Sequence, residues 1–279
     1  MAGFGRKALR GTEPRRRLLL VILMIATAAG LAMVGIGTLG RGRPEGAPTS
    51  SIRSRHGAAT VVGLGDSVMA GSACGCGGPA AAYATLMSRS LGRQVDAVNL
   101  GVAGATTTSL ARQLRTARVR SAVARARVVL VIIGANDLLP QLRRYRASAC
   151  DSSCYDPAIE TMANRLDGVL HQIAAIRRGR RGTVLIGDYW NVFQDGSSER
   201  QRHGEAEISW SRGVSRVANK ATCRVGADDG AVCVDTYDPF LAHGEDPDRY
   251  LAADGDHPNK AGIALIARQL QKATPKAAF

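Results

Sequence analysis

The residues of this chain that could do chemistry lie in four short segments. The first, Gly65-Asp66-Ser67, follows an apolar run and supplies a hydroxyl, and two later segments supply Gly104 and Asn136. The last, Asp254-Gly255-Asp256-His257, places a carboxylate three residues before an imidazole. Serine, histidine and aspartate are the nucleophile, general base and orienting group of acyl transfer through a serine ester. Together the four segments predict a serine hydrolase.

Ser67 has the surroundings of an exposed nucleophile. Gly65 permits the sharp strand-to-helix turn that presents a hydroxyl, and a helix that begins there favours a developing negative charge. An ordinary N-capping serine would have the same neighbours, so this segment alone does not separate the two roles. The chain has no Gly-x-Ser-x-Gly elbow, which disfavours an ordinary α/β-hydrolase.

His257 is the predicted general base, with Asp254 as its orienting carboxylate. It alone among the five histidines has an aspartate at i−3, so one turn of loop can bring that carboxylate to Nδ1 and leave Nε2 facing Ser67. The other four are His56 in a linker, His171 and His203 on or near helices, and the loop residue His243, which is the serious competitor.

Strand and helix patterns alternate along the part of the chain that carries these segments. Apolar, β-branched runs occur at 60–64, 95–100, 128–133, 183–187 and 231–235. Helical periodicity occurs at 79–92, 106–119, 157–178, 203–222 and 260–273. This alternation predicts a parallel sheet covered by helices on both faces, with ligands bound beyond the carboxyl ends of the strands. Three of the four motifs begin where a strand ends and the fourth precedes the final helix, so we expect them at one rim.

The motifs also resemble a known family. Gly65-Asp66-Ser67, Gly104, Gly134-Ala135-Asn136-Asp137 and Asp254-Gly255-Asp256-His257 are similar to the four blocks of the SGNH (GDSL) hydrolase superfamily, over roughly residues 60–273. The first block continues with Val68 in place of the usual leucine, an apolar-for-apolar change. The resemblance implies a three-layer α/β/α, flavodoxin-like fold and a carboxylic-ester hydrolase (esterase or lipase) without metal or other cofactor. The cysteine-bearing, secreted layout is similar to actinobacterial members.

The resemblance also implies roles for individual residues. Ser67 corresponds to the nucleophile, and the oxyanion hole would be formed by the backbone N–H groups of Ser67 and Gly104 and the side-chain amide of Asn136. In isolation, Gly104 could equally be a turn glycine and Asn136 a helix cap. The three other aspartates of the motifs are expected to be structural or capping residues: Asp66, Asp137 and Asp256.

The sequence does not identify the ester. Tyr189, Trp190 and Phe193, just past the fourth strand, either line an acyl pocket or pack under the loop between Cys150 and Cys154, and we favour the packing role. Three functions stay open. The first is an esterase or lipase acting on small acyl esters or lipids outside the cell, and the second an O-acyltransferase or deacetylase acting on acylated envelope polysaccharide. The third, an inactive membrane-tethered binding protein, is disfavoured by the intact set of motifs.

The N-terminus has the pattern of a membrane anchor. Residues 1–17 carry six basic side chains and one acidic one, and Leu18 to Gly40 is uncharged over 23 residues, enough for a helix to cross about 30 Å of hydrocarbon. The basic end is expected in the cytoplasm. Ala26-Thr27-Ala28 resembles a signal-peptide cleavage site, but the long uncharged run favours an uncleaved transmembrane helix over a secreted protein. Residues 41–58 are predicted to be a flexible linker, which leaves 59–279 as one extracytoplasmic hydrolase domain.

Charge and cysteine content bound the partners and the compartment. Of the net charge of +14, residues 1–58 contribute +8 (ten basic, two acidic) and the rest +6, and only 4% of residues are aromatic, which disfavours a nucleic-acid partner.

Six cysteines beyond a signal segment indicate disulfides in an oxidising compartment, with 15 possible connectivities. Proximity favours Cys150–Cys154 and Cys223–Cys233, which leaves a tight Cys74–Cys76 pair by exclusion. A zinc site is disfavoured because the spacing matches no standard ligand pair.

Overall fold

The computed structural model describes residues 58–150, 154–241 and 246–279. The chain divides into two units, Met1–Ile52 and Arg53–Phe279, and every described residue lies in the second. The predicted basic segment 1–17, the apolar segment 18–40 and residues 41–57 of the predicted linker therefore lie outside the described residues. Within the described residues, no helix is both long and apolar enough to cross a bilayer.

Five parallel strands form the centre of the described domain. They are β1 (Ala59–Gly65), β2 (Val95–Asn99), β3 (Val128–Ile132), β4 (Thr183–Gly187) and β5 (Val232–Val234), in the spatial order β2-β1-β3-β4-β5. The central strands β1 and β3 are buried along nearly their whole length. A strand that is covered on both faces needs apolar side chains on both, which is why these two read as continuous apolar runs.

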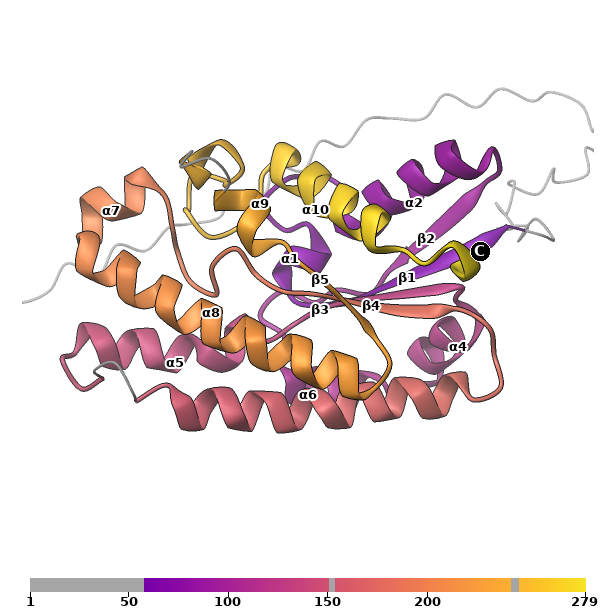
Figure 1. Cartoon of the computed structure of the whole chain (residues 1–279), viewed down its shortest axis with the longest axis horizontal. Coiled ribbons are helices and arrows are strands. Elements are labelled where there is room, and N and C mark those ends of the chain that lie inside the picture. The colour runs from indigo at the N-terminus through magenta and orange to yellow at the C-terminus, as the bar shows by residue number, and fades with distance from the viewer. Residues whose placement is uncertain (1–57, 151–153, 242–245) are drawn as a thin grey trace, which may run out of the picture. The chain divides into compact units, whose positions relative to one another are not determined.

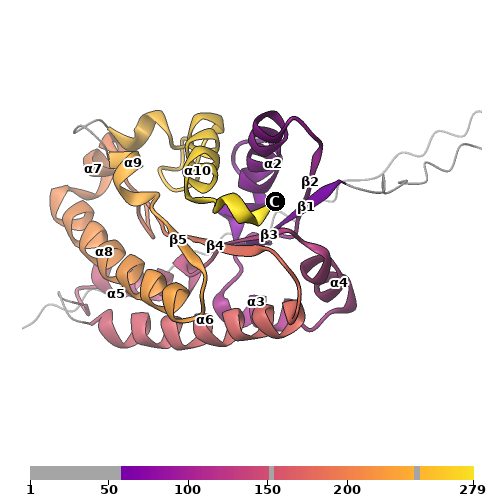
Figure 2. The same ribbon diagram turned by 45° about the vertical axis from the view of Figure 1, so that its right-hand side comes forward.

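Helices cover both faces of this sheet (Figures 1 and 2). One layer is formed by α2 (Gly78–Leu91) and α10 (Lys260–Ala273), which pack against each other. The opposite layer contains α3 (Thr107–Gln113), α4 (Ala117–Arg125), α5 (Ala135–Arg146), α6 (Asp156–Arg177) and α8 (Glu205–Asp228). The shorter elements are α1 (Ser67–Ala70), α7 (Ser197–His203), α9 (Tyr237–Leu241) and the 3-10 turns η2 (Pro247–Arg249) and η3 (Lys276–Ala278). The predicted three-layer α/β/α fold is confirmed.

Two helical predictions need correction. The single helix expected over 106–119 is two helices, because Thr116 has extended backbone (φ −74°, ψ 142°) and begins α4 as its N-cap. The helix α5 was not predicted at all. Its first turn holds the Gly-Ala-Asn-Asp motif, and Pro140 inside it lacks the N–H that a continuous helix needs. Leu138 and Leu142 are nevertheless buried one turn apart, and this burial stabilises the helix despite the proline.

Three disulfides join the six cysteines in the sequential pairs favoured above. They are Cys74–Cys76, Cys150–Cys154 and Cys223–Cys233, each with 5.2 Å between the Cα atoms. The last one ties the final turns of α8 to β5, the short strand at the edge of the sheet. The other two close local loops, between α1 and α2 and between α5 and α6.

Candidate active site

Ser67 is presented by a turn that its neighbours force. Gly65 ends β1 with φ +152°, and a Cβ there would collide with the carbonyl of Ile132 in the adjacent strand. Asp66 then caps α1, because its Oδ1 accepts a hydrogen bond from the backbone N–H of Val68 (3.0 Å). The capping residue is therefore Asp66, and the hydroxyl of Ser67, the first residue of the helix, is not used as a cap.

His257 connects Ser67 to Asp254. Its Nε2 lies 2.8 Å from Oγ of Ser67, and its Nδ1 lies 2.8 Å from Oδ2 of Asp254. The other oxygen of Asp254 accepts hydrogen bonds from the backbone N–H groups of Asp256 (3.0 Å) and His257 (2.9 Å). Burial would raise the pKa of Asp254, but these bonds and His257 outweigh it and hold that pKa below its ordinary value. The predicted serine, histidine and aspartate thus form one hydrogen-bonded chain.

The loop that carries this pair is held from both sides. Gly255 has φ +67°, which lets the chain turn tightly between Asp254 and His257. The backbone N–H of Ala252 donates to the carbonyl of His257 (2.7 Å), and Leu251 pairs with Pro258 in an antiparallel bridge. This small hairpin fixes the direction of the imidazole before α10 begins.

Asn136 and Gly104 are brought near each other by the ends of β2 and β3. The side-chain amide of Asn136, in the first turn of α5, donates to the carbonyl of Ala105 (3.0 Å). Asp137 accepts from the backbone N–H (2.9 Å) and the hydroxyl (2.7 Å) of Thr107, which is the supporting role expected for it. Gly104 has φ +74°, and the space where a Cβ would lie is open. An amide has two N–H groups, so Asn136 keeps one for another acceptor.

A buried pair behind the nucleophile was not predicted from sequence. The hydroxyl of Tyr189 donates to Oδ2 of Asp66, and both residues are almost fully buried. Burial raises the pKa of Asp66 from 3.8 to about 7, although the hydrogen bonds from Tyr189 and Val68 oppose the rise. Tyr189 follows β4 and Asp66 follows β1, so the parallel sheet brings together residues 123 positions apart. No local pattern in the sequence signals this contact.

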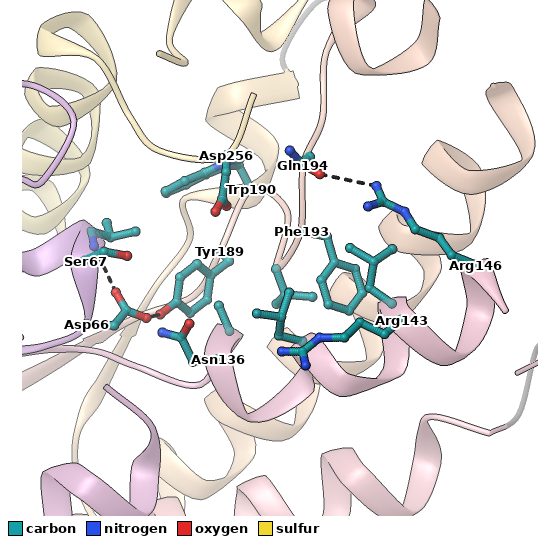
Figure 3. Close-up of a pocket in the computed structure, with 15 residues that line it drawn as sticks. Asp66, Ser67, Asn136, Arg143, Arg146, Tyr189, Trp190, Phe193, Gln194 and Asp256 are labelled. Atoms are coloured by element: carbon teal, nitrogen blue, oxygen red, sulfur yellow. Dashed lines mark hydrogen bonds between the residues drawn. The ribbon is translucent and has the colours of Figure 1, made fainter. Parts of the chain in front are cut away.

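A cavity of about 340 Å³ opens beside Ser67 (Figure 3). Its apolar lining consists of Val68, Ala135, Leu139, Leu142, Tyr189, Trp190, Val192 and Phe193. Its polar lining consists of Asp66, Ser67, Asn136, Arg143, Arg146, Gln194 and Asp256. Tyr189, Trp190 and Phe193 therefore line a pocket, whereas the sequence favoured packing. The packing role is partly present too, because Phe193 stacks on Trp210 (5.5 Å between ring centroids), which meets Tyr155 beside Cys154 edge-on.

The remaining titratable candidates lie elsewhere or play secondary parts. Asp256 lines the cavity, but its carboxylate is 3.8 Å from Nδ1 of His257, farther than that of Asp254. His56 and His243 lie outside the described residues. His203 pairs with carboxylates of α7 and α8. Within the described part of the chain, a single group of three could hold a metal ion: the exposed His171 with the partly exposed Asp167 and Asp229. None of the three lines the cavity.

Comparison with known proteins identifies the family of the chain. A family model for the GDSL-like lipase/acylhydrolase family matches residues 64–265. The chain belongs to this family. As a GDSL-family hydrolase, it has the fold and the type of activity, ester hydrolysis, that the motifs predicted. No curated protein matches it in sequence.

Solved structures share this family member's fold at low sequence identity. A lipase from a goat rumen metagenome matches with a TM-score of 0.66 and 21% identity, over 77% of this chain and 97% of that one. Phospholipase A1 from Streptomyces albidoflavus matches with a TM-score of 0.57 and 19% identity, over 78% and 100%. A variant of an acetylxylan esterase from Geobacillus stearothermophilus matches with a TM-score of 0.54 and 16% identity, over 77% and 93%.

Proposed function

We propose that this family member is a serine esterase that works outside the cytoplasm, with Ser67 as nucleophile, His257 as general base and Asp254 as the carboxylate that orients His257. The observation that carries the proposal is the hydrogen-bonded chain from Oγ of Ser67 through His257 to Asp254, with both distances at 2.8 Å. A neutral imidazole held by a carboxylate at Nδ1 accepts a proton at Nε2, which is what activation of a serine hydroxyl requires.

The reaction follows from this arrangement. His257 takes the proton of Ser67 as Oγ attacks the carbonyl carbon of the ester, and a tetrahedral oxyanion forms. The backbone N–H groups of Ser67 and Gly104 and the free amide N–H of Asn136 are proposed to stabilise that oxyanion. His257 then protonates the leaving alcohol, and water repeats the sequence on the acyl-enzyme.

The acyl group is proposed to occupy the cavity beside Ser67. The leaving oxygen must lie next to Nε2 of His257, because it receives its proton there. Asn136, a proposed oxyanion donor, lines the cavity and His257 does not, which supports placing the acyl chain there rather than the leaving alcohol. Its apolar wall suits the methylene groups of an acyl chain.

Location outside the cytoplasm is supported by the cysteines. All six pair as disulfides in the described domain, and such bonds persist in oxidising compartments. The basic and apolar N-terminal segments add the pattern of a membrane tether with the hydrolase domain on the far side. We propose a single-pass membrane protein, and a secreted one if the segment is cleaved.

A substrate panel tests the proposal. Purified protein and its Ser67→Ala variant are assayed on p-nitrophenyl esters of short and long acyl chains, on phospholipid and on acetylated xylan. The last two are included because a phospholipase A1 and an acetylxylan esterase share the fold. We expect ester hydrolysis by the wild type only. We also expect a fluorophosphonate to modify Ser67 covalently, which mass spectrometry would detect. Substantial hydrolysis by folded Ser67→Ala protein would refute the assignment of the nucleophile.

A further inference from the structure

One face of α5 forms a long side of the cavity. Asn136, Leu139, Leu142, Arg143 and Arg146 line it, at the spacings of three and four residues that put side chains on one helix face. Figure 3 shows Ser67 and Asn136 toward one end of the cavity and the two arginines toward the other. A substrate that extends along α5 from the nucleophile therefore passes apolar side chains first and meets guanidinium groups afterwards.

The two arginines differ in whether a carboxylate neutralises their charge. Arg146 pairs with Glu207 through Nη2 (2.6 Å) and Nε (3.0 Å), and its Nη2 also contacts Gln194 (3.3 Å). Within the described residues, Arg143 has no carboxylate within 4.0 Å and its side chain makes no hydrogen bond. A guanidinium carries five N–H donors in a planar fork that fits carboxylate and phosphate oxygens. The cavity thus contains one cation that protein groups of the described domain leave unneutralised.

From this we infer that Arg143 selects esters whose acyl group ends in an anion, such as the monoesters of dicarboxylic acids. The inference rests on the proposed esterase function and names a substrate class for the same site. Arg143 is seven positions after Asn136, which corresponds to about 10 Å along the helix axis. An acyl chain of medium length spans that interval, with its methylene groups against Leu139 and Leu142 and its terminal carboxylate at the guanidinium.

The expected preference is modest because Arg143 is exposed. Exposed ion pairs contribute up to about 1 kcal/mol, which corresponds to a roughly fivefold difference in kcat/KM. The contact binds a part of the substrate that does not react, so it acts on KM more than on kcat. Salt screens an exposed pair, so the preference decreases as ionic strength rises.

Paired substrate series test this inference with the full-length protein. The p-nitrophenyl monoesters of adipic, suberic and sebacic acids are compared with the p-nitrophenyl esters of hexanoic, octanoic and decanoic acids. We expect the wild type to favour the anionic member of at least one pair about fivefold. Arg143→Gln is expected to abolish that preference, and Arg143→Lys is expected to keep part of it.

The matched control is Arg144→Gln. Arg144 has the same charge on the same helix, but it bonds to Gln141 and the carbonyl of Ala149 and does not line the cavity. Its loss should leave the ratio unchanged. Two outcomes would overturn this inference alone. One is an equal fall of the ratio in Arg143→Gln and Arg144→Gln. The other is a wild type that hydrolyses the neutral esters but shows no preference for the anionic ones. No hydrolysis of either series, of phospholipid or of acetylated xylan would overturn the proposed function and this inference with it, whereas hydrolysis of only the last two would overturn the inference alone.

Discussion

Asp66→Asn is expected to change how stability depends on pH. The carboxyl of Asp66 is buried behind the nucleophile, where burial raises its pKa from 3.8 to about 7. Between these two pH values the unfolded chain releases this proton while the folded protein holds it, so folding must take a proton up. The free energy of unfolding therefore falls as pH rises through this interval, and the stability from the neutral carboxyl is fully present only below about pH 4.

The size of this effect follows from the two pKa values. Their difference of about 3, at about 1.4 kcal/mol per pKa unit, corresponds to about 4 kcal/mol lost between pH 4 and pH 7. Asparagine has nearly the same shape and does not ionise, so the variant lacks this loss. Burial also raises the pKa of Asp188 to about 7, but that contribution is common to both proteins and cancels in their difference.

Urea unfolding at a series of pH values from 4 to 8 measures this difference. We expect the free energy of unfolding of Asp66→Asn, minus that of the wild type, to rise by several kcal/mol over the series. Asp254→Asn provides a control that should stay nearly flat over this series. The pKa of Asp254 lies below its ordinary value, so its carboxyl is largely ionised in the folded and unfolded states above about pH 4, and its contribution to stability is lost only at lower pH. A flat difference curve for Asp66→Asn would show that Asp66 ionises normally and would refute the reasoning.

Three further predictions concern catalysis and redox state. Asn136→Ala should lower kcat by about 10²–10³-fold with a smaller change in KM, because the amide stabilises the oxyanion of the transition state more than the bound ester. Steady-state kinetics on one ester checks this, and a change in KM alone would make Asn136 a substrate-binding residue. His257→Ala should remove nearly all activity, whereas His243→Ala should keep it, and the reverse outcome would replace the proposed base. Protein isolated without reductant should show no free thiols by mass spectrometry, and reduction should lower stability by up to about 2–4 kcal/mol per bridge, less for these short loops; six free thiols would contradict the proposed compartment.

The sequence predicted the features of the site that depend on local chemistry and on strand ends. Asp254 and His257 are three residues apart, so one tight turn sets their contact. Ser67 and Asn136 come directly after β1 and β3, which are neighbours in the sheet, and parallel strands present their carboxyl ends at the same edge. Strand positions and strand direction were enough to bring these residues together without knowledge of any side-chain contact.

The features that the sequence left unresolved depend on contacts between distant segments. The hydrogen bond from Tyr189 to Asp66 exists because β4 and β1 both flank β3, and no spacing within either segment encodes it. The helix α5 was missed because its stability comes from buried Leu138 and Leu142 rather than from its proline-containing sequence. Without that helix, the position of Arg143 in the cavity, away from the nucleophile, had no signal in the sequence.

The residues proposed to catalyse the reaction and those proposed to select the substrate are held by different parts of the fold. The groups proposed to break the ester are fixed by backbone: a turn after β1, a turn at Gly255 and the first turn of α5. The groups that would choose the acyl chain are side chains farther along α5 and in the loop after β4, and few of them bear on the positions of Ser67 or His257. Substitutions along that face of α5 can therefore change the preferred ester while the hydrogen-bonded chain stays intact. Tyr189 is the exception, because it lines the cavity with its ring and holds Asp66 with its hydroxyl. Tyr189→Ala should therefore affect both acyl preference and the nucleophile's turn, whereas Tyr189→Phe keeps the ring and should affect the turn alone.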